Sequence, residues 1–289
     1  MGTIRIGTSG WRYEPWRGKF YPKGLTQKQE LHFASRKLSS IEINGTFYSL
    51  QRPAYFQQWA GETPDDFVFA VKGPNFITHM KRLRDIEEPL ANFFASGVLA
   101  LGQKLGPFLW QFPPNFQYDH QRFADFFALL PFDTSSALKL AKKHGKVITK
   151  DRAWLKAGPK RTLRHAVEFR HESFLNKEFV QLLRDWNVAM VIADTAERFP
   201  FVEDITADFL YLRMHGEDEL YVSGYTDSAI ARWADRIRLW SRGKEPADAN
   251  RVSSKKPPRA KSRDVYVYFD NSVKVHSPKD AMTLMARLA

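Results

Sequence analysis

Short apolar segments of strand length recur along the whole chain, and segments with a helical pattern lie between them. The segments predicted as strands are 4–8, 41–48, 67–72, 108–112, 166–170, 188–194, 209–215 and 265–270. Eight strand-then-helix units in 289 residues predict an α/β protein, a (β/α)8 TIM-like barrel that forms one domain over residues 1–289. An open doubly wound sheet is the alternative, but no Gly-x-Gly-x-x-Gly turn follows any of these segments.

The segment 41–48 shows most clearly how such a strand would divide its side chains. Ile41 and Ile43 point to one side, while Glu42, Asn44 and Thr46 point to the other, as the two-residue period of a strand requires. Catalytic groups of TIM barrels come from the carboxyl ends of the strands. The polar side of this segment is therefore predicted to face a functional site.

The other predicted strands also carry polar residues near their carboxyl ends. The expected inward-facing ring consists of Ser9, Glu42, Asn44, Thr46, Lys72, Gln111, Glu168, Arg170, Asp194, Arg213, His215, Asp270 and Asn271. Burying so many polar groups without partners costs several kcal/mol each. One interpretation is a stabilising ion-pair network, with Glu168–Arg170 and Glu42–Lys72 as salt bridges. The other, which we favour for the ring as a whole, is a site that meets a ligand.

Aromatic residues are predicted in the loops just beyond strands 1, 2 and 7. They are Trp11, Tyr13, Trp16, Phe47, Tyr48, Tyr221 and Tyr225. Aromatic side chains beside polar groups suit stacking on sugars or bases, whereas each one alone is equally compatible with loop packing.

Four residues of the ring are candidates for acid–base catalysis: Glu42, Glu168, Asp194 and His215. The same four would hold a divalent cation such as Mg²⁺ or Mn²⁺ if the protein uses a metal cofactor, although the neighbouring cations already balance much of their charge. The ring is therefore predicted to receive an anionic small molecule. The candidate substrate-binding residues are Ser9, Trp11, Asn44, Thr46, Tyr48, Lys72, Gln111, Arg170, Arg213, Tyr225, Asp270 and Asn271.

The formal net charge of +12 is concentrated in two segments. Residues 139–164 contain ten Lys or Arg and one acid, and residues 241–263 contain eight and two acids. They belong to expected insertions at about 133–163 and 241–263, which precede strands 5 and 8. Both insertions are therefore expected at the amino-terminal face of the barrel, opposite the site, as solvated loops. Weak binding of nucleic acid or an acidic partner is the alternative.

The chain has no cysteine, and no apolar run approaches the ~18 residues of a membrane span. We therefore expect a cytoplasmic protein without a membrane partner.

Distinctive motifs recur in order along the chain, among them GTSGW at 7–11, EINGTFY at 42–48, QFPP at 111–114, HAVEFRH at 165–171, YLRMHG at 211–216 and VYVYFDN at 265–271. Together these motifs resemble those of the YecE-like family, domain-of-unknown-function family 72. The resemblance implies a TIM-like barrel and supports a site at these motifs, but it implies no specific activity. Three functions stay open: an enzyme for an anionic small molecule, a metal-assisted nucleic-acid-processing or nucleic-acid-binding barrel, and a non-catalytic ligand-binding module.

Overall fold

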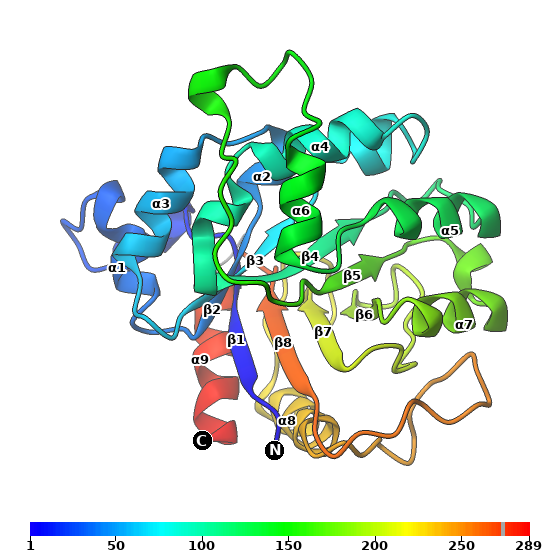
Figure 1. Ribbon diagram of the computed structural model, residues 1–289. Coiled ribbons are helices and arrows are strands. Elements are labelled where there is room, and N and C mark those ends of the chain that lie inside the picture. The colour runs from blue at the N-terminus through cyan, green and yellow to red at the C-terminus, as the bar shows by residue number, and fades with distance from the viewer. Residues whose placement is uncertain (273–274) are drawn as a thin grey trace.

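Eight parallel strands form a closed barrel in chain order, each paired with its sequence neighbours and the first paired with the last (Figure 1). The computed structural model describes residues 1–272 and 275–289. The strands are β1 (Ile4–Ser9), β2 (Ser40–Ile43), β3 (Val68–Lys72), β4 (Leu105–Gln111), β5 (His165–Glu168), β6 (Ala189–Asp194), β7 (Phe209–Met214) and β8 (Asp264–Phe269). The predicted (β/α)8 barrel is confirmed.

Helices connect the strands and cover the outside of the barrel. They are α1 (Glu30–Ala34), α2 (Gly45–Tyr48), α3 (Pro53–Glu62), α4 (Glu87–Ala95), α5 (His120–Leu129), α6 (Thr134–Ala141), α7 (Lys177–Asp185), α8 (Asp227–Ser241) and α9 (His276–Leu288). Further helical segments include η3 (Phe76–Met80) and η4 (Val98–Lys104). Within the described parts of the chain, no helix combines the length and the apolarity needed to cross a lipid bilayer.

The strands separate two apolar clusters, as the alternation of their side chains requires. The smaller cluster fills the barrel with Ala70, Leu109, Ala166, Val191, Tyr211 and further residues of the same strand sides. The larger cluster lies between the strands and the helices. Small side chains on β3, β5 and β6 leave room for tyrosines on β7 and β8. The polar ends of the strands lie above this packed interior.

One predicted strand is shorter than expected, and one helical stretch is divided in two. The strand predicted at 41–48 ends at Ile43, because Asn44 already has helical backbone angles and residues 45–48 form α2. A helical segment between strands 3 and 4 is interrupted at Gly97, whose φ of 119° lies in the left-handed region. A side chain at Gly97 would collide with the backbone of Pro53, so glycine is required at this close approach.

The two basic segments lie at different places. Segment 241–263 lies at the amino-terminal end of the barrel, as predicted, where the amide of Gly2 donates to the carbonyl of Ser241 (Figure 1). It lacks helix and strand after Ser241, yet the carboxylate of Asp204 accepts from the amides of Val252 and Ser253. Part of this loop is therefore held to the barrel by a buried carboxylate.

The expected placement of segment 133–163 at the amino-terminal face is wrong for its tip. The tip extends along α4, where the Gly145 amide donates to Asn92 Oδ1 at 2.8 Å. Val147 then lies beside Tyr48 and Phe76, which follow the carboxyl ends of β2 and β3. The two ends of the segment meet near the start of β5, where Asp133 and Thr162 form a β-bridge, but α6 is long enough to carry the tip to the other face (Figure 1).

Candidate functional site

Arg213 lies near the carboxyl end of β7 on its inward-facing side, and its side chain has no solvent exposure. Three carboxylates surround its guanidinium. Nη2 donates to Glu42 Oε1 at 2.9 Å and to Asp270 Oδ2 at 2.8 Å, while Nη1 donates to Glu168 Oε2 at 2.8 Å. Nη2 also lies 2.9 Å from Ser9 Oγ. Arg213 is the counter-ion that allows these carboxylates to be buried.

Glu42 and Glu168 have no oxygen left for a ligand. Glu42 Oε1 accepts from Ser9 Oγ, and Glu42 Oε2 accepts from Tyr211 Oη at 2.5 Å in addition to the central guanidinium. Glu168 Oε1 accepts from Arg170 Nε at 3.0 Å. Burial raises the pKa of Glu168, but the two arginines outweigh this effect and hold that pKa well below its usual range. Both carboxylates are structural anchors of the site.

Asp270, directly after β8, is the carboxylate of the site that reaches solvent, with 18% of its side chain exposed. Its Oδ2 accepts from the central guanidinium and lies 3.3 Å from Nδ1 of the buried His215. Burial raises the pKa of Asp270, whereas the guanidinium and His215 lower it further, to a net value of about 2. Asp270 is therefore ionised at neutral pH, and the buried Nδ1 of His215 beside it has no hydrogen-bond partner among the described residues.

Lys72, at the end of β3, has a different environment from the other cations of the site. The side chain is 8% exposed, and its Nζ lies 4.2 Å from the ring centroid of Phe47. Among residues 1–272 and 275–289, no hydrogen bond or ion pair is found for this ammonium group. Burial and the nearby Arg213 lower the pKa of Lys72 to about 8. A fraction of this amine is thus neutral near physiological pH.

The remaining groups at the barrel mouth are partly exposed. The guanidinium of Arg170 is 12% exposed and donates to Tyr221 Oη at 2.8 Å, while it lies 4.7 Å from the ring of Phe199. His79 packs edge-on against Phe47, and burial together with Lys72 lowers the pKa of His79 to about 4. The mouth therefore presents two cations, one carboxylate and a neutral imidazole.

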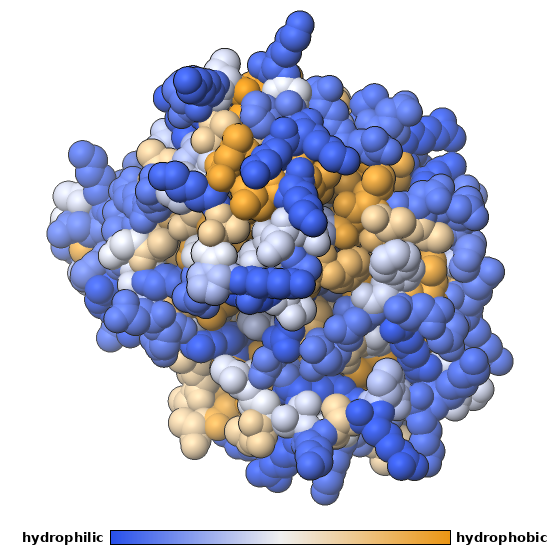
Figure 2. Space-filling view, viewed as in Figure 1, coloured by the Kyte–Doolittle hydropathy of each residue, from blue (hydrophilic) through white to orange (hydrophobic). Residues whose placement is uncertain are grey.

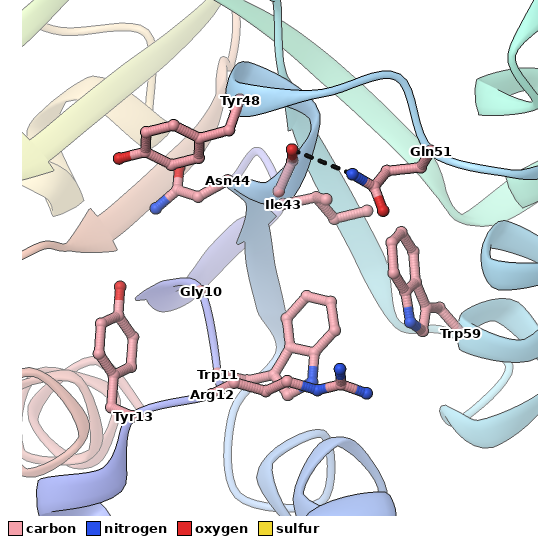
Figure 3. Close-up of a pocket in the computed structure, with 10 residues that line it drawn as sticks. Gly10, Trp11, Arg12, Tyr13, Ile43, Asn44, Tyr48, Gln51 and Trp59 are labelled. Atoms are coloured by element: carbon pink, nitrogen blue, oxygen red, sulfur yellow. Dashed lines mark hydrogen bonds between the residues drawn. The ribbon is translucent and has the colours of Figure 1, made fainter.

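A cavity of about 360 Å³ adjoins this cluster between the β1–α1 loop and α2 and α3 (Figure 3). Trp11 and Trp59 lie on one side of it, and Asn44 and Tyr48 lie on the other. Asn44 joins the cavity to the charged cluster, since its Nδ2 donates to Ser9 Oγ at 2.9 Å. Its Oδ1 has no hydrogen-bond partner among the described residues. This oxygen is buried, so Asn44 is a polar group of the cavity wall with one unsatisfied acceptor.

Asp194 is not part of the ring, contrary to the sequence prediction, and Tyr225, predicted to bind substrate, lies beside it outside the ring. The inward side of β6 is formed by Ala189, Val191 and Ala193, so Asp194 faces the helices instead. There it lies beside Tyr225 and Trp233 of α8, and burial raises the pKa of Asp194. A polar residue at the end of a strand can point to either side of the sheet. Asp194 was predicted to point inward, but the neighbouring Ala193 occupies the inward side.

Three other residues were predicted to bind substrate. Two of them, Asn271 and Thr46, make hydrogen bonds within the protein, and the third, Gln111, is buried at the end of β4. Asn271 is buried, and its Nδ2 donates to Asp280 Oδ2 of α9 at 2.8 Å. The hydroxyl of Thr46 donates to the carbonyl of Lys72 at 2.6 Å, which fixes α2 on β3. Gln111 lies at the end of β4 in register with Glu168, with a side chain that is 5% exposed.

The geometry also changes two predicted roles. Arg213 is not a direct anion binder, because it is fully buried and its donors are occupied by carboxylates. Of the two predicted ion pairs, Glu168–Arg170 is present, whereas Glu42 pairs with Arg213 in place of Lys72. The predicted metal ligands do not fit a cation, because a guanidinium lies between two of them and Asp194 faces away. Within the described residues, no group of three potential metal-binding side chains lies together.

The sequence prediction missed Tyr211, Trp59 and Gln51. Tyr211 precedes Arg213 by two residues, so the same alternation could have placed it in the barrel. Trp59 and Gln51 reach the cavity from α3 and the loop before it. No pattern in the sequence distinguishes those two residues from ordinary helix and loop residues.

Comparisons with known proteins agree with this fold. The family described as "Protein of unknown function DUF72" matches residues 5–289. UPF0759 protein YecE of Escherichia coli K12 is 30% identical over 113 residues, which is 39% of either chain. UPF0759 protein YunF of Bacillus subtilis 168 is 29% identical over 118 residues, 39% of this chain and 41% of that protein. The alignments thus span about two fifths of these curated relatives.

Solved structures of similar proteins cover nearly the whole chain. A DUF72 family protein from Thermotoga maritima has a TM-score of 0.73 at 24% identity and covers 99% of both chains. A DUF72 family protein from Enterococcus faecalis has a TM-score of 0.67 at 17% identity and covers 100% of this chain and 98% of that one. These similarities support the fold, and the match over residues 5–289 confirms the family resemblance seen in the motifs. The chain belongs to the DUF72 family.

Proposed function

We propose that this protein is an enzyme that acts on an anionic small molecule, such as a phosphorylated compound, at the mouth of the barrel. The observation that carries this proposal is the environment of Lys72. Lys72 is 8% exposed, and its ammonium group has no anionic partner within 4.0 Å among the described residues. A buried charge without a partner is unfavourable, and an anionic ligand would supply that partner.

Arg170 provides a second cation for the same ligand. Its Nε and Nη2 are directed to Glu168, and Nη2 also reaches Tyr221, which fixes the orientation of the guanidinium. Its Nη1 has no hydrogen bond within the described parts of the chain and is available to a ligand. A preorganised guanidinium beside an ammonium group is a suitable receptor for phosphate or carboxylate oxygens.

Lys72 and Asp270 are the groups of the mouth that can contact a bound substrate directly. Asp270 is ionised, partly exposed and held by Arg213, so it can accept a hydrogen bond from a substrate hydroxyl or amine and orient that group, whereas its low pKa makes it a weak base. Lys72, whose pKa burial lowers to about 8 in the free protein, is mainly protonated at neutral pH and can pair with the anionic group. This assignment replaces Glu42, Glu168 and Asp194, whose oxygens are occupied or face away. His215 is fully buried with Nδ1 3.3 Å from Asp270 Oδ2, so it cannot contact the substrate and is assigned the role of a positioning residue.

A screen of phosphorylated and carboxylated metabolites tests the proposal in two steps. The first step measures the rise in melting temperature that each compound causes in the wild-type protein and in Lys72→Met. A compound that stabilises only the wild type is then incubated with the protein, and its conversion is followed by mass spectrometry. We expect conversion by the wild type and loss of conversion, with binding retained, in Asp270→Asn.

Two controls separate an enzyme from a binding module. Lys104→Met removes a lysine that donates to the carbonyls of Ala60 and Thr63 away from the mouth, and it should leave ligand binding unchanged. Binding that survives in Lys72→Met would contradict the proposed receptor. Binding that depends on Lys72 without conversion of any bound compound would favour the non-catalytic module.

A further inference from the structure

The tip of the first basic segment, residues 142–150, lies next to α2 and η3, which follow the carboxyl ends of β2 and β3. Val147 lines a hollow of about 260 Å³ together with Tyr48 and Phe76. Phe47 also lines this hollow and packs against Lys72, so the hollow lies at the edge of the mouth. We call the surface formed by Tyr48, Phe76 and residues 142–150 the α2 rim.

Three large apolar side chains of the α2 rim are exposed to solvent close to one another. Tyr48 is 76% exposed, Phe76 is 43% exposed and Val147 is 65% exposed. Figure 2 shows hydrophobic residues among hydrophilic ones over the part of the molecule where this segment lies. Exposed apolar groups that gather around a hollow indicate a binding surface.

Tyr48 stands between two hollows. It lines the hollow beside Val147 and also the cavity of about 360 Å³ that contains Trp11 and Trp59. Successive flat groups joined by a flexible backbone could therefore occupy both sides of Tyr48.

The charge of the α2 rim identifies the backbone that would join those groups. Residues 142–150 contain Lys142, Lys143, Lys146 and Lys150 and no carboxylate, and all four lysines are exposed. Val147, which lines the apolar hollow, directly follows Lys146, and the four lysines outnumber the single carboxylate of Glu88 that lies beside Gly145. An apolar hollow next to such a positive segment matches bases carried on a chain of phosphates.

We propose that the α2 rim binds a single-stranded nucleic acid, with bases stacked at Tyr48 and phosphates contacting Lys142 and Lys146. A duplex would fit less well, because its bases are stacked on each other and cannot reach Tyr48. This binding does not require turnover at the mouth, so it stands or falls separately from the proposed enzyme.

Fluorescence anisotropy with a labelled single-stranded DNA of about 12 nucleotides tests the proposal. Tyr48→Ala should weaken binding by roughly 5- to 100-fold, whereas Tyr48→Phe should retain it, because base stacking needs the ring and not the hydroxyl. Measurements between about 50 and 200 mM salt should show that Lys142→Ala/Lys146→Ala reduces the salt dependence by about 1.4 in the log–log slope.

The second basic segment supplies a matched control. Lys256→Ala/Lys261→Ala removes the same number of exposed charges at the opposite end of the barrel and should change affinity less than twofold. Equal losses in the two double variants would overturn the proposal, because they would indicate binding to net charge alone. Unchanged binding in Tyr48→Ala, equal affinity for a duplex, or stronger binding to anionic phospholipid vesicles would overturn it as well.

Discussion

Two buried cations of the barrel, Arg213 and Lys72, lie within one electrostatic cluster and have opposite environments. The guanidinium of Arg213 has no exposure and contacts three carboxylates. The ammonium group of Lys72 has a small opening to solvent and packs against Phe47, with no ion-pair partner among the described residues. A fully paired charge contributes to the fold, whereas an unpaired one is maintained at the expense of stability. The comparison assigns Arg213 to structure and Lys72 to function.

Replacing Arg213 should have the largest effect on stability. Arg213→Met leaves three carboxylates without their shared counter-ion and should lower the free energy of unfolding by about 3 to 5 kcal/mol. Urea unfolding at neutral pH measures this difference. Arg238→Met is a suitable control, because Arg238 is 39% exposed and pairs with an exposed aspartate on the same helix, a pair worth about 0.5 kcal/mol. A decrease in the free energy of unfolding of less than about 1 kcal/mol in Arg213→Met would contradict the structural role of Arg213.

Replacing Lys72 should have the opposite sign. Its pKa falls from 10.5 to about 8 on folding, so the charged form is disfavoured in the folded protein. Lys72→Met should therefore raise the free energy of unfolding at pH 7 by about 3 kcal/mol. The difference in free energy of unfolding between Lys72→Met and the wild type should have its full value below about pH 8. It should disappear as the pH rises through about 10.5, because Lys72 of the wild type is then neutral in both the folded and the unfolded state. A destabilised Lys72→Met would contradict an unpaired ammonium group.

Acid titration distinguishes Asp270 from an ordinary surface carboxylate. Folding lowers its pKa from 3.8 to about 2, so its contribution to stability is present above about pH 4 and is lost as the pH falls towards 2. The wild type should lose about 2 kcal/mol more than Asp270→Asn over this range. Parallel pH profiles, measured by urea unfolding at each pH, would show that Asp270 is not coupled to Arg213.

Tyr211→Phe should have the smallest effect of the four variants. It removes one hydroxyl that donates to Glu42 Oε2, while the guanidinium still contacts that oxygen. We expect a loss of about 1.5 kcal/mol in urea unfolding, typical of a hydrogen bond to a charged group. A loss as large as that of Arg213→Met would mean that Glu42 depends on tyrosine more than on arginine.

The sequence predicted the barrel well because its signal is repeated eight times. A strand boundary that is wrong by one or two residues, such as the end of β2, does not change the number or the order of the strands. Alternation also brought Ser9, Glu42, Glu168 and Arg213 to the same side of the barrel, where the structure connects them.

The ion pairs of the site, and the side of the strand on which Asp194 lies, could not be predicted from the sequence of single strands. Which carboxylate contacts Arg213 depends on the closure of the barrel, which brings β2, β5 and β8 around β7. The position of Asp194 depends on a shift of one residue, and one residue reverses the side of a strand. The path of segment 133–163 depends on packing against α4, which its composition does not encode.

Titration of Lys72 by NMR tests the central assignment most directly. Lysines carrying a ¹³C-methyl label on Nζ would be followed from pH 6 to pH 11, and the resonance of Lys72 identified by its absence in Lys72→Met. The structure predicts a pKa of about 8 in the free protein and a higher value when inorganic phosphate is added, because a bound anion favours the charged amine. A pKa near 10.5, or one that phosphate leaves unchanged, would contradict a buried ammonium group reserved for an anionic ligand.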